Sequence, residues 1–228
     1  MKVNAIIPAK GNSSRFEKKN LQKINTKSLT YIACEKCLDC ANIDHVYLDT
    51  DSQEIIDDVC PLMERGLKIL ERPEHLRTEI PGNNRINELL LFALQNTEPC
   101  DLILHVHVTS PLLSISTLEN SISTFVASKN YDSFFTAIHF KDYLWTPNAE
   151  PVNFDSKGPL LNCADLPKYW LETHGVYGIL SSALLSLKRR VGDKPLPVEI
   201  PEIESIDINN HLDFEYLKLV IEKGGINI

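Results

Sequence analysis

The chain has 228 residues, of which 43% are hydrophobic and 24% are charged, and this length suits one α/β domain, residues 1–228, better than two. The formal net charge of −8 argues against a general nucleic-acid-binding protein, because such proteins neutralise phosphates with clustered Lys and Arg. The apolar stretch at residues 3–9 is too short for a signal peptide core or a membrane span. The sequence therefore predicts a cytoplasmic protein without membrane association.

Short runs rich in Val and Ile alternate along the chain with longer segments of helical periodicity. This alternation is typical of βαβ units, and it predicts an α/β fold with a mainly parallel sheet and helices on both faces. The predicted strands are residues 3–8, 44–49, 67–70, 102–108, 133–138, 175–180, 196–200 and 206–208. The predicted helices are residues 28–41, 53–64, 85–95, 116–128, 182–189 and 212–222.

Between residues 141 and 172 the apolar residues follow neither a helical nor a strand pattern, and prolines are interspersed with aromatic residues. We interpret this segment as a small excursion from the sheet. Exposed aromatic surface is unfavourable in water, so these rings either fold back onto their own sheet or cover another subunit.

In open α/β sheets, ligands bind beyond the carboxyl ends of the strands, and four polar segments occupy such positions. The first, residues 8–20, contains Lys10, Arg15, Lys18 and Lys19. Cations on a polar turn suit a triphosphate, although this segment lacks the ending of a Walker A loop and is alternatively a solvated basic connector. The other three segments are LDTDS at 48–52, HVTSPLL at 107–113 and SIDINN at 205–210.

Two acidic residues and two histidines near strand ends admit more than one interpretation. Asp51 is placed to cap the following helix, which we favour over metal binding by Asp49 and Asp51. His105 and His107 share one strand face, so the pair has a geometry that could bind a metal. Alternatively, His107 contacts a ligand or forms hydrogen bonds with its neighbours.

Glu71 and Arg72 are either a surface ion pair or, because they end a strand, a ligand contact. Cys34, Cys37 and Cys40 have spacing that suits small buried residues on one flank of a helix, and we favour that interpretation over a metal site because no fourth cysteine is close in sequence.

Five motifs in chain order resemble the acylneuraminate cytidylyltransferase family, which includes CMP-sialic acid synthetases. The family's typical opening reads IIPAR, then Ser, then Lys-Asn, and this chain has AIIPAKGNSSRFEKKN. Its later elements are matched in order by LDTDS, Glu71-Arg72-Pro73, Thr109-Ser110-Pro111-Leu112 and Ser205-Ile206-Asp207-Ile208. An ordered set of five is more specific than any single element, and the resemblance implies a fold like that of nucleotide-diphospho-sugar transferases.

The resemblance and the strand-end positions together assign roles to residues of this chain. The expected CTP-binding residues are Pro8, Ala9, Lys10, Gly11, Ser13, Arg15, Lys19, Asn20, Arg72 and His107. The expected sugar-binding residues are Thr109, Ser110, Lys141, His174 and Gly175, with Lys141 and His174 as candidates for the sugar carboxylate. Asp207 and Asn209 are expected to bind Mg²⁺, and the expected catalytic residues are Lys10, Lys19 and Asp207.

The chain departs from the family pattern mainly where the sugar is expected. His107 stands where the family commonly has Gln, and Leu113 stands where Arg usually follows TSPL. Asn209 replaces the second acid of SIDID, so a second metal would be held less firmly. The usual N-G-x-x-Y stretch is His174-Gly175-Val176-Tyr177 in this chain.

These observations predict a magnesium-dependent cytidylyltransferase that transfers CMP from CTP to the anomeric hydroxyl of an acidic keto-sugar, such as a sialic acid-like nonulosonic acid, and releases pyrophosphate. Two alternatives stay open: a nucleotidyltransferase that acts on a phosphonate or sugar phosphate, and a nucleotide-binding homologue without catalysis. The sequence identifies neither the sugar nor a general base. The resemblance also implies a homodimer, in which residues 141–172 complete the neighbour's sugar pocket.

Overall fold

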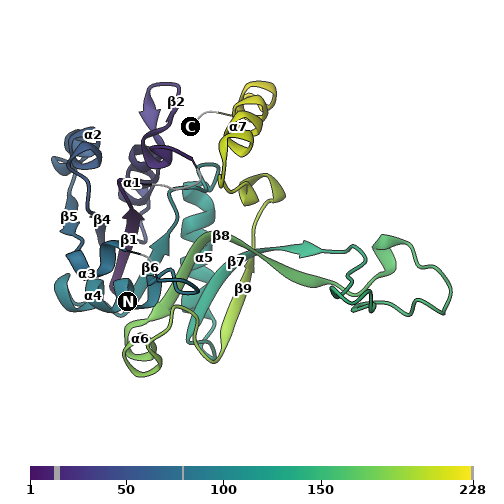
Figure 1. Ribbon diagram of the computed structural model, residues 1–228. Coiled ribbons are helices and arrows are strands. Elements are labelled where there is room, and N and C mark those ends of the chain that lie inside the picture. The colour runs from purple at the N-terminus through teal and green to yellow at the C-terminus, as the bar shows by residue number, and fades with distance from the viewer. Residues whose placement is uncertain (13–15, 79, 227–228) are drawn as a thin grey trace.

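The computed structural model describes residues 1–12, 16–78 and 80–226, and a mixed seven-stranded sheet forms its centre (Figure 1). The strand order is β5 (Leu67–Glu71), β4 (His45–Thr50), β1 (Val3–Ala9), β6 (Leu102–Val106), β8 (Tyr169–Leu180), β7 (Ser133–Phe140) and β9 (Pro195–Glu199). β1 pairs in parallel with β4 and β6, β4 with β5, and β7 with β9, whereas β8 runs antiparallel to β6 and β7. The carboxyl ends of β1, β4, β5 and β6 therefore meet at one edge, which the amino-terminal half of β8 also reaches.

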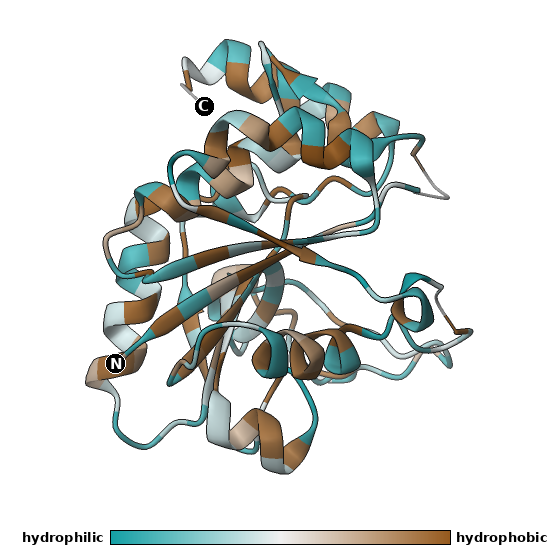
Figure 2. Cartoon of the chain, turned by 90° about the vertical axis from the view of Figure 1, so that its left-hand side faces the viewer, coloured by the Kyte–Doolittle hydropathy of each residue, from teal (hydrophilic) through white to brown (hydrophobic). Residues whose placement is uncertain are grey.

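Alternating side chains of the strands divide the apolar core into two clusters, one on each face of the sheet. Ile7 belongs to one cluster and the adjacent Ile6 to the other. The first cluster includes side chains of α1 (Leu29–Asp39), α2 (Gln53–Met63), α5 (Ile115–Ala127) and α7 (His211–Gly224). The second includes side chains of α3 (Glu74–Arg77), α4 (Ile86–Asn96) and α6 (Ser181–Leu187). Figure 2 shows helices on both sides of the sheet, so the predicted fold class is confirmed.

Side-chain caps fix several helix ends close to their predicted positions. The hydroxyls of Ser28, Ser52 and Ser114 accept hydrogen bonds from the third backbone N–H of α1, α2 and α5, which satisfies donors that have no partner within the helix. The predicted cap at Asp51 is wrong by one residue, because the Ser52 hydroxyl takes that position and leaves the Asp51 carboxylate available elsewhere. Within the described ranges, no helix is long and apolar enough to cross a membrane.

The structure differs from the prediction at three places. Residues 206–208 form no strand, and the Ile208 N–H donates to the Thr109 carbonyl in the loop after β6. β8 begins at residue 169 rather than 175, since its first residues pair with the far end of β7. The predicted loops also contain a short hairpin and small helices: β2 (Lys23–Ile24), β3 (Lys27–Ser28), α3, η1 (Lys19–Leu21), η2 (Cys163–Asp165) and η3 (Glu202–Ser205).

The predicted excursion is an arm, residues 138–171, which projects from the body of the molecule (Figure 1). The ends of β7 and β8 form its stem, in which Trp170 pairs with His139. Further out, the Phe154 ring packs edge-on against Tyr143 and Trp145 at centroid distances of 4.6 and 4.9 Å. The aromatic side chains therefore pack largely on one another within the arm, and Trp145 is still 53% exposed.

Candidate active site

A cleft of about 840 Å³ lies at the edge of the sheet where the strand ends meet. One wall, called here the β1 side, includes Lys10, Lys19, Asn20 and Arg72. The opposite wall, called the β8 side, includes His105, His107, His174 and Arg190. Of the residues predicted from the sequence, those that line the cleft are Pro8, Lys10, Lys19, Asn20, Arg72, His107, Thr109, His174, Asp207 and Asn209.

The loop after β1 is anchored to the loop after β4. The Gly11 N–H donates to Asp51 Oδ1 at 2.9 Å, and a Cβ atom at Gly11 would lie 2.8 Å from Ser52 Cβ, so this close approach requires glycine. The Asn20 amide donates to the Lys10 carbonyl at 2.8 Å and closes the loop. Ser13 and Arg15 lie outside the described residues, and their predicted contacts with CTP stay predictions.

A buried ion pair supports the β1 side. Arg72 Nε lies 2.5 Å from Asp49 Oδ1, and the two residues are 2% and 0% exposed. Burial raises the pKa of Asp49 to about 6, although Arg72 opposes that shift; the carboxylate is therefore ionised at pH 7. The interpretation of Glu71 and Arg72 as a surface ion pair is therefore wrong. Arg72 is buried, whereas Glu71 is exposed and lies 3.7 Å from Arg77.

The C-terminal segment places two oxygen-bearing side chains in the cleft. Ile208 is fully buried, its N–H donates to the Thr109 carbonyl at 2.9 Å, and its own carbonyl accepts from Lys19 Nζ at 2.9 Å. Asp207 and Asn209 flank Ile208 and line the cleft, and the Asn209 amide lies 2.7 Å from Asp207 Oδ2. Asp207 Oδ1 is buried, and it has no hydrogen-bond partner in the part of the chain that the structure describes.

His105 and His107 form the floor of the β8 side, with ring centroids 4.2 Å apart. Burial, reinforced by Arg190, lowers the pKa of His107 to about 3, and burial also lowers the pKa of His105 well below its usual value. Both imidazoles are therefore neutral at pH 7. They contribute hydrogen-bonding groups to the cleft rather than charge.

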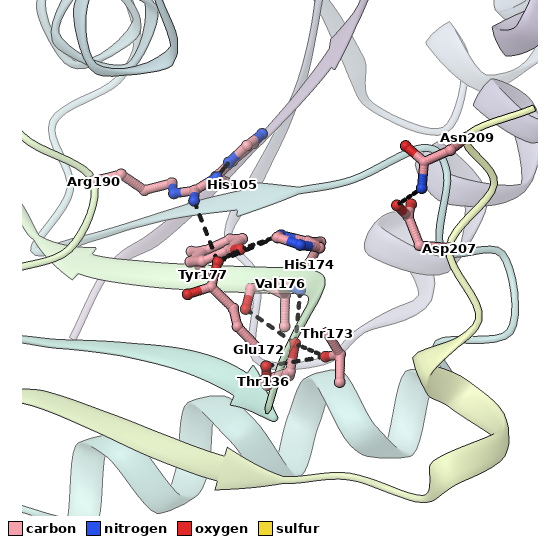
Figure 3. Close-up of polar contacts among 10 residues, drawn as sticks. All are labelled: His105, Thr136, Glu172, Thr173, His174, Val176, Tyr177, Arg190, Asp207 and Asn209. Atoms are coloured by element: carbon pink, nitrogen blue, oxygen red, sulfur yellow. Dashed lines mark hydrogen bonds and ion pairs between the residues drawn. The ribbon is translucent and has the colours of Figure 1, made fainter. Parts of the chain in front are cut away.

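A network of four polar side chains lies next to His105 (Figure 3). The Tyr177 hydroxyl donates to Glu172 and lies 2.8 Å from His174 Nδ1. Arg190 stacks on the Tyr177 ring, with the guanidinium carbon 3.5 Å from the ring centroid. Hydrogen bonding to His174 lowers the pKa of Glu172 to about 2, and the same contact raises the pKa of His174.

Sequence reasoning missed Glu172, Tyr177 and Arg190 as site residues. Glu172 ends the segment without periodicity, and in the sequence Tyr177 stands out only as part of the His174-Gly175-Val176-Tyr177 stretch. Arg190 follows α6, where the predicted order of strands and helices gives no sign of a site. Their assembly depends on the antiparallel pairing of β8 with β6, in which Tyr177 faces His105.

The remaining predicted residues lie beside or away from the cleft. Ala9, Ser110 and Gly175 are buried, and the Gly175 carbonyl accepts from the His107 N–H at 3.1 Å. Lys141 lines a separate hollow of about 630 Å³ at the base of the arm. Within one subunit, the structure therefore does not bring Lys141 to the other predicted sugar-binding residues.

The metal sites considered for the cysteines and the histidine pair find no support. Cys34, Cys37 and Cys40 are buried free thiols whose pKa values burial raises, so they stay protonated and are poor ligands. Within residues 1–12, 16–78 and 80–226, no group of three or more His, Cys, Asp or Glu side chains is placed to hold a metal ion. A metal bound at Asp207 would thus need ligands from the substrate.

A cleft at the carboxyl ends of parallel strands, lined by cations and an acidic residue, has the position at which α/β enzymes bind nucleotides. Two solved structures share the fold. CMP:2-keto-3-deoxy-manno-octonic acid synthetase complexed with CTP has a TM-score of 0.68 at 14% identity, covering 98% of this chain and 100% of that chain. 4-Diphosphocytidyl-2C-methyl-D-erythritol synthase from Anaerococcus prevotii has a TM-score of 0.66 at 14% identity, covering 97% and 98%.

The model of the cytidylyltransferase family matches residues 4–174, and the chain belongs to this family of CTP-dependent nucleotidyltransferases. A pseudaminic acid cytidylyltransferase of Campylobacter jejuni subsp. jejuni serotype O:2 is 25% identical over 96% of both chains. An 8-amino-3,8-dideoxy-manno-octulosonate cytidylyltransferase of Shewanella frigidimarina is 31% identical over 55% of this chain and 48% of its own. The predicted family is thereby confirmed.

Proposed function

We propose that this protein transfers the cytidylyl group of CTP to the anomeric hydroxyl of an acidic keto-sugar of the nonulosonic acid class, with Mg²⁺ as cofactor and release of pyrophosphate. The observation that carries the proposal is the charge distribution in the cleft. Cations line both the β1 side and the β8 side, and the C-terminal segment adds the Asp207 carboxylate. Two anionic substrates need such a site, and the Campylobacter relative is named for an acidic sugar of this class.

The reaction replaces the phosphoanhydride bond between the α- and β-phosphates of CTP by a phosphate ester bond to the sugar. The sugar hydroxyl oxygen attacks the α-phosphorus, the bond from that phosphorus to the oxygen bridging to the β-phosphate breaks, and the hydroxyl proton is released. Lys10 and Lys19, which line the cleft, would neutralise the charge on the departing pyrophosphate, and the anchored loop would orient the triphosphate. His107, with a pKa of about 3, is too weak a base to accept the proton efficiently at pH 7.

Asp207 and Asn209 fit the proposed Mg²⁺. Mg²⁺ is commonly bound by one or two carboxylates together with substrate phosphates and water, and the buried Asp207 Oδ1 has no partner among the residues that the structure describes. When bound, the ion would neutralise phosphate oxygens in the reaction. Asn209 would add a neutral oxygen ligand after rotation of its amide.

A pyrophosphate-release screen tests this function by crossing four nucleoside triphosphates with a panel of keto-sugar acids, sugar phosphates and phosphonates. We expect release only with CTP and a keto-sugar acid, and only with Mg²⁺ present. Release with a phosphorylated acceptor would indicate a different nucleotidyltransferase. CTP binding without release for any acceptor would indicate a non-catalytic homologue. The homodimer and the cytoplasmic location expected from the sequence belong to this proposal.

A further inference from the structure

The β8 side of the cleft carries a guanidinium group to which the mechanism above gives no role. Arg190 lies in the loop after α6. Its backbone N–H donates to Asn87 Oδ1 at 2.8 Å, and this hydrogen bond anchors the loop to α4. The side chain is 18% exposed, stacks on Tyr177 and lines the cleft. The group is thus held in one plane with one edge toward the cleft.

The polar contacts of the Arg190 side chain fix the position of the guanidinium, but they are too long to be strong hydrogen bonds. Nη2 lies 3.5 Å from Glu172 Oε1, and Nη1 lies 3.5 Å from His105 Nδ1. Both distances exceed the roughly 2.7–2.9 Å of a charge-assisted hydrogen bond. Glu172 Oε1 also accepts from Tyr177 and lies 3.4 Å from His174 Nδ1. One carboxylate oxygen is therefore shared by three donors.

The cations of the β8 side share their acidic partners. Glu172 lies near both Arg190 and His174, and it raises the pKa of His174, as Asp207 does to a smaller extent. The Glu172 oxygen that Arg190 reaches also accepts from Tyr177. On the β1 side, by contrast, Asp49 contacts Arg72 directly at 2.5 Å. A substrate anion would supply the short contact that the Arg190 guanidinium lacks.

We propose that Arg190, together with His174, binds the carboxylate of the acceptor sugar, and that Glu172 and Tyr177 are positioning residues for both. The inference rests on the proposed function and adds to it the group that selects an acid over a neutral sugar. A planar guanidinium matches the two oxygens of a carboxylate. In a 2-keto sugar acid, the carboxylate is bonded to the anomeric carbon, so holding it also orients the attacking hydroxyl.

The position of the pair separates this anion site from the triphosphate. Figure 3 shows Arg190 at the Tyr177 ring, on whose face it stacks, and His174 beside the Tyr177 hydroxyl, with Asp207 and Asn209 beyond His174. Lys19 contacts the Ile208 carbonyl between these two residues. The Lys19 ammonium thus lies at the proposed metal-binding pair, whereas Arg190 lies at the Tyr177 ring, so the two cations are available to different substrates.

The test compares a keto-sugar acid that the wild-type enzyme accepts with the carboxamide of the same sugar. The variants are Arg190→Met, which removes the charge, and Arg190→Lys, which keeps the charge but loses the planar fork. Arg189→Met is the matched control, because Arg189 is exposed and pairs with Asp193. The measurements are kcat/KM for each acceptor, KM for CTP, and thermal melting.

For Arg190→Met we expect kcat/KM for the acid to fall at least about tenfold, the loss of one hydrogen bond to a charged group. The values for the carboxamide and the KM for CTP should stay within about twofold, so that acid selectivity falls. Arg190→Lys should lose part of that selectivity, and Arg189→Met should lose none.

Equal losses for acid and carboxamide, or no loss for either, would overturn the assignment of Arg190. If Arg190→Met does not fold, Arg190→Lys must still lose activity with the acid selectively, and failure to do so also overturns it. Failure of the proposed function is distinguishable, because wild-type enzyme would then release no pyrophosphate with any keto-sugar acid. That result would remove the carboxylate assignment as well.

Discussion

The two sides of the cleft are built differently. On the β1 side, the Arg72–Asp49 pair is 2.5 Å apart and buried, and Gly11 anchors the first loop to Asp51. On the β8 side, the contacts of Arg190 are 3.5 Å long, and the His174 side chain is 51% exposed. The β1 side is thus held by short, buried contacts, which suits the CTP site proposed there, whereas on the β8 side the Arg190 guanidinium has only long polar contacts, which suits the acceptor site proposed there.

The family match extends across both sides of the cleft. It covers residues 4–174, which include the β1 side as well as His105, His107 and His174, and it ends before Tyr177 and Arg190. Two departures from the family motifs, His107 and Leu113, lie on or next to the β8 wall. The contact proposed for Arg190 therefore lies outside the part of the chain that the family match covers.

The largest expected effect comes from Asp207→Asn, because Asp207 lies where the two sides meet. Loss of this carboxylate should lower kcat at least about 100-fold by weakening the proposed Mg²⁺ site, while melting temperature and circular dichroism stay near wild type. Steady-state pyrophosphate release across a Mg²⁺ titration is the measurement. Asp193→Asn, an exposed acid paired with Arg189, is the control, and wild-type activity of Asp207→Asn at limiting Mg²⁺ would refute the site.

The substitution Asp49→Ala removes the carboxylate of the buried ion pair on the β1 side. It leaves a buried guanidinium without its carboxylate, which should cost about 3 kcal/mol of the free energy of unfolding and raise the KM for CTP. Urea denaturation and steady-state kinetics measure the two effects. The control, Glu71→Gln, alters an exposed side chain 3.7 Å from Arg77 and should change stability by less than about 0.5 kcal/mol. A loss below about 1 kcal/mol for Asp49→Ala would mean that the pair does not support this side.

The contrast between the two sides of the cleft also explains which site residues could be predicted from the sequence. Polar residues that directly follow parallel strands, such as Lys10 and Arg72, could be predicted because strand ends gather at one edge. The Asp49–Arg72 pair could not, since its two residues lie on different strands and nothing local favours Asp49 over Asp51. Arg190 follows a helix, and its partner, the buried Tyr177, is brought beside His105 by an antiparallel pairing that periodicity does not reveal.

The arm offers a test of whether the β8 side extends into a second subunit. Trp145 and Trp170 are 53% and 43% exposed, and we predict that Trp145→Ala with Trp170→Ala converts a homodimer to monomers. Acceptor KM should rise several-fold and CTP KM should stay within about twofold, because only the acceptor wall would lose a neighbour. Light scattering at micromolar concentration and kinetics decide this. Tyr216→Ala, an exposed aromatic on α7, should stay dimeric; a monomeric wild type would refute the prediction.

The smallest expected effect is that of Asn209→Asp, which sharpens the comparison at the metal-binding pair. The Asn209 amide now lies 2.7 Å from Asp207 Oδ2, so a second carboxylate there would repel Asp207 when no cation is bound. The variant should melt at a lower temperature without Mg²⁺ and recover when Mg²⁺ is added, and half-saturating Mg²⁺ for pyrophosphate release should fall about two- to fivefold. Asn130→Asp adds the same charge at an exposed loop and should change neither value. An unchanged Mg²⁺ titration together with an unchanged metal-free melting temperature would show that residue 209 does not face the metal.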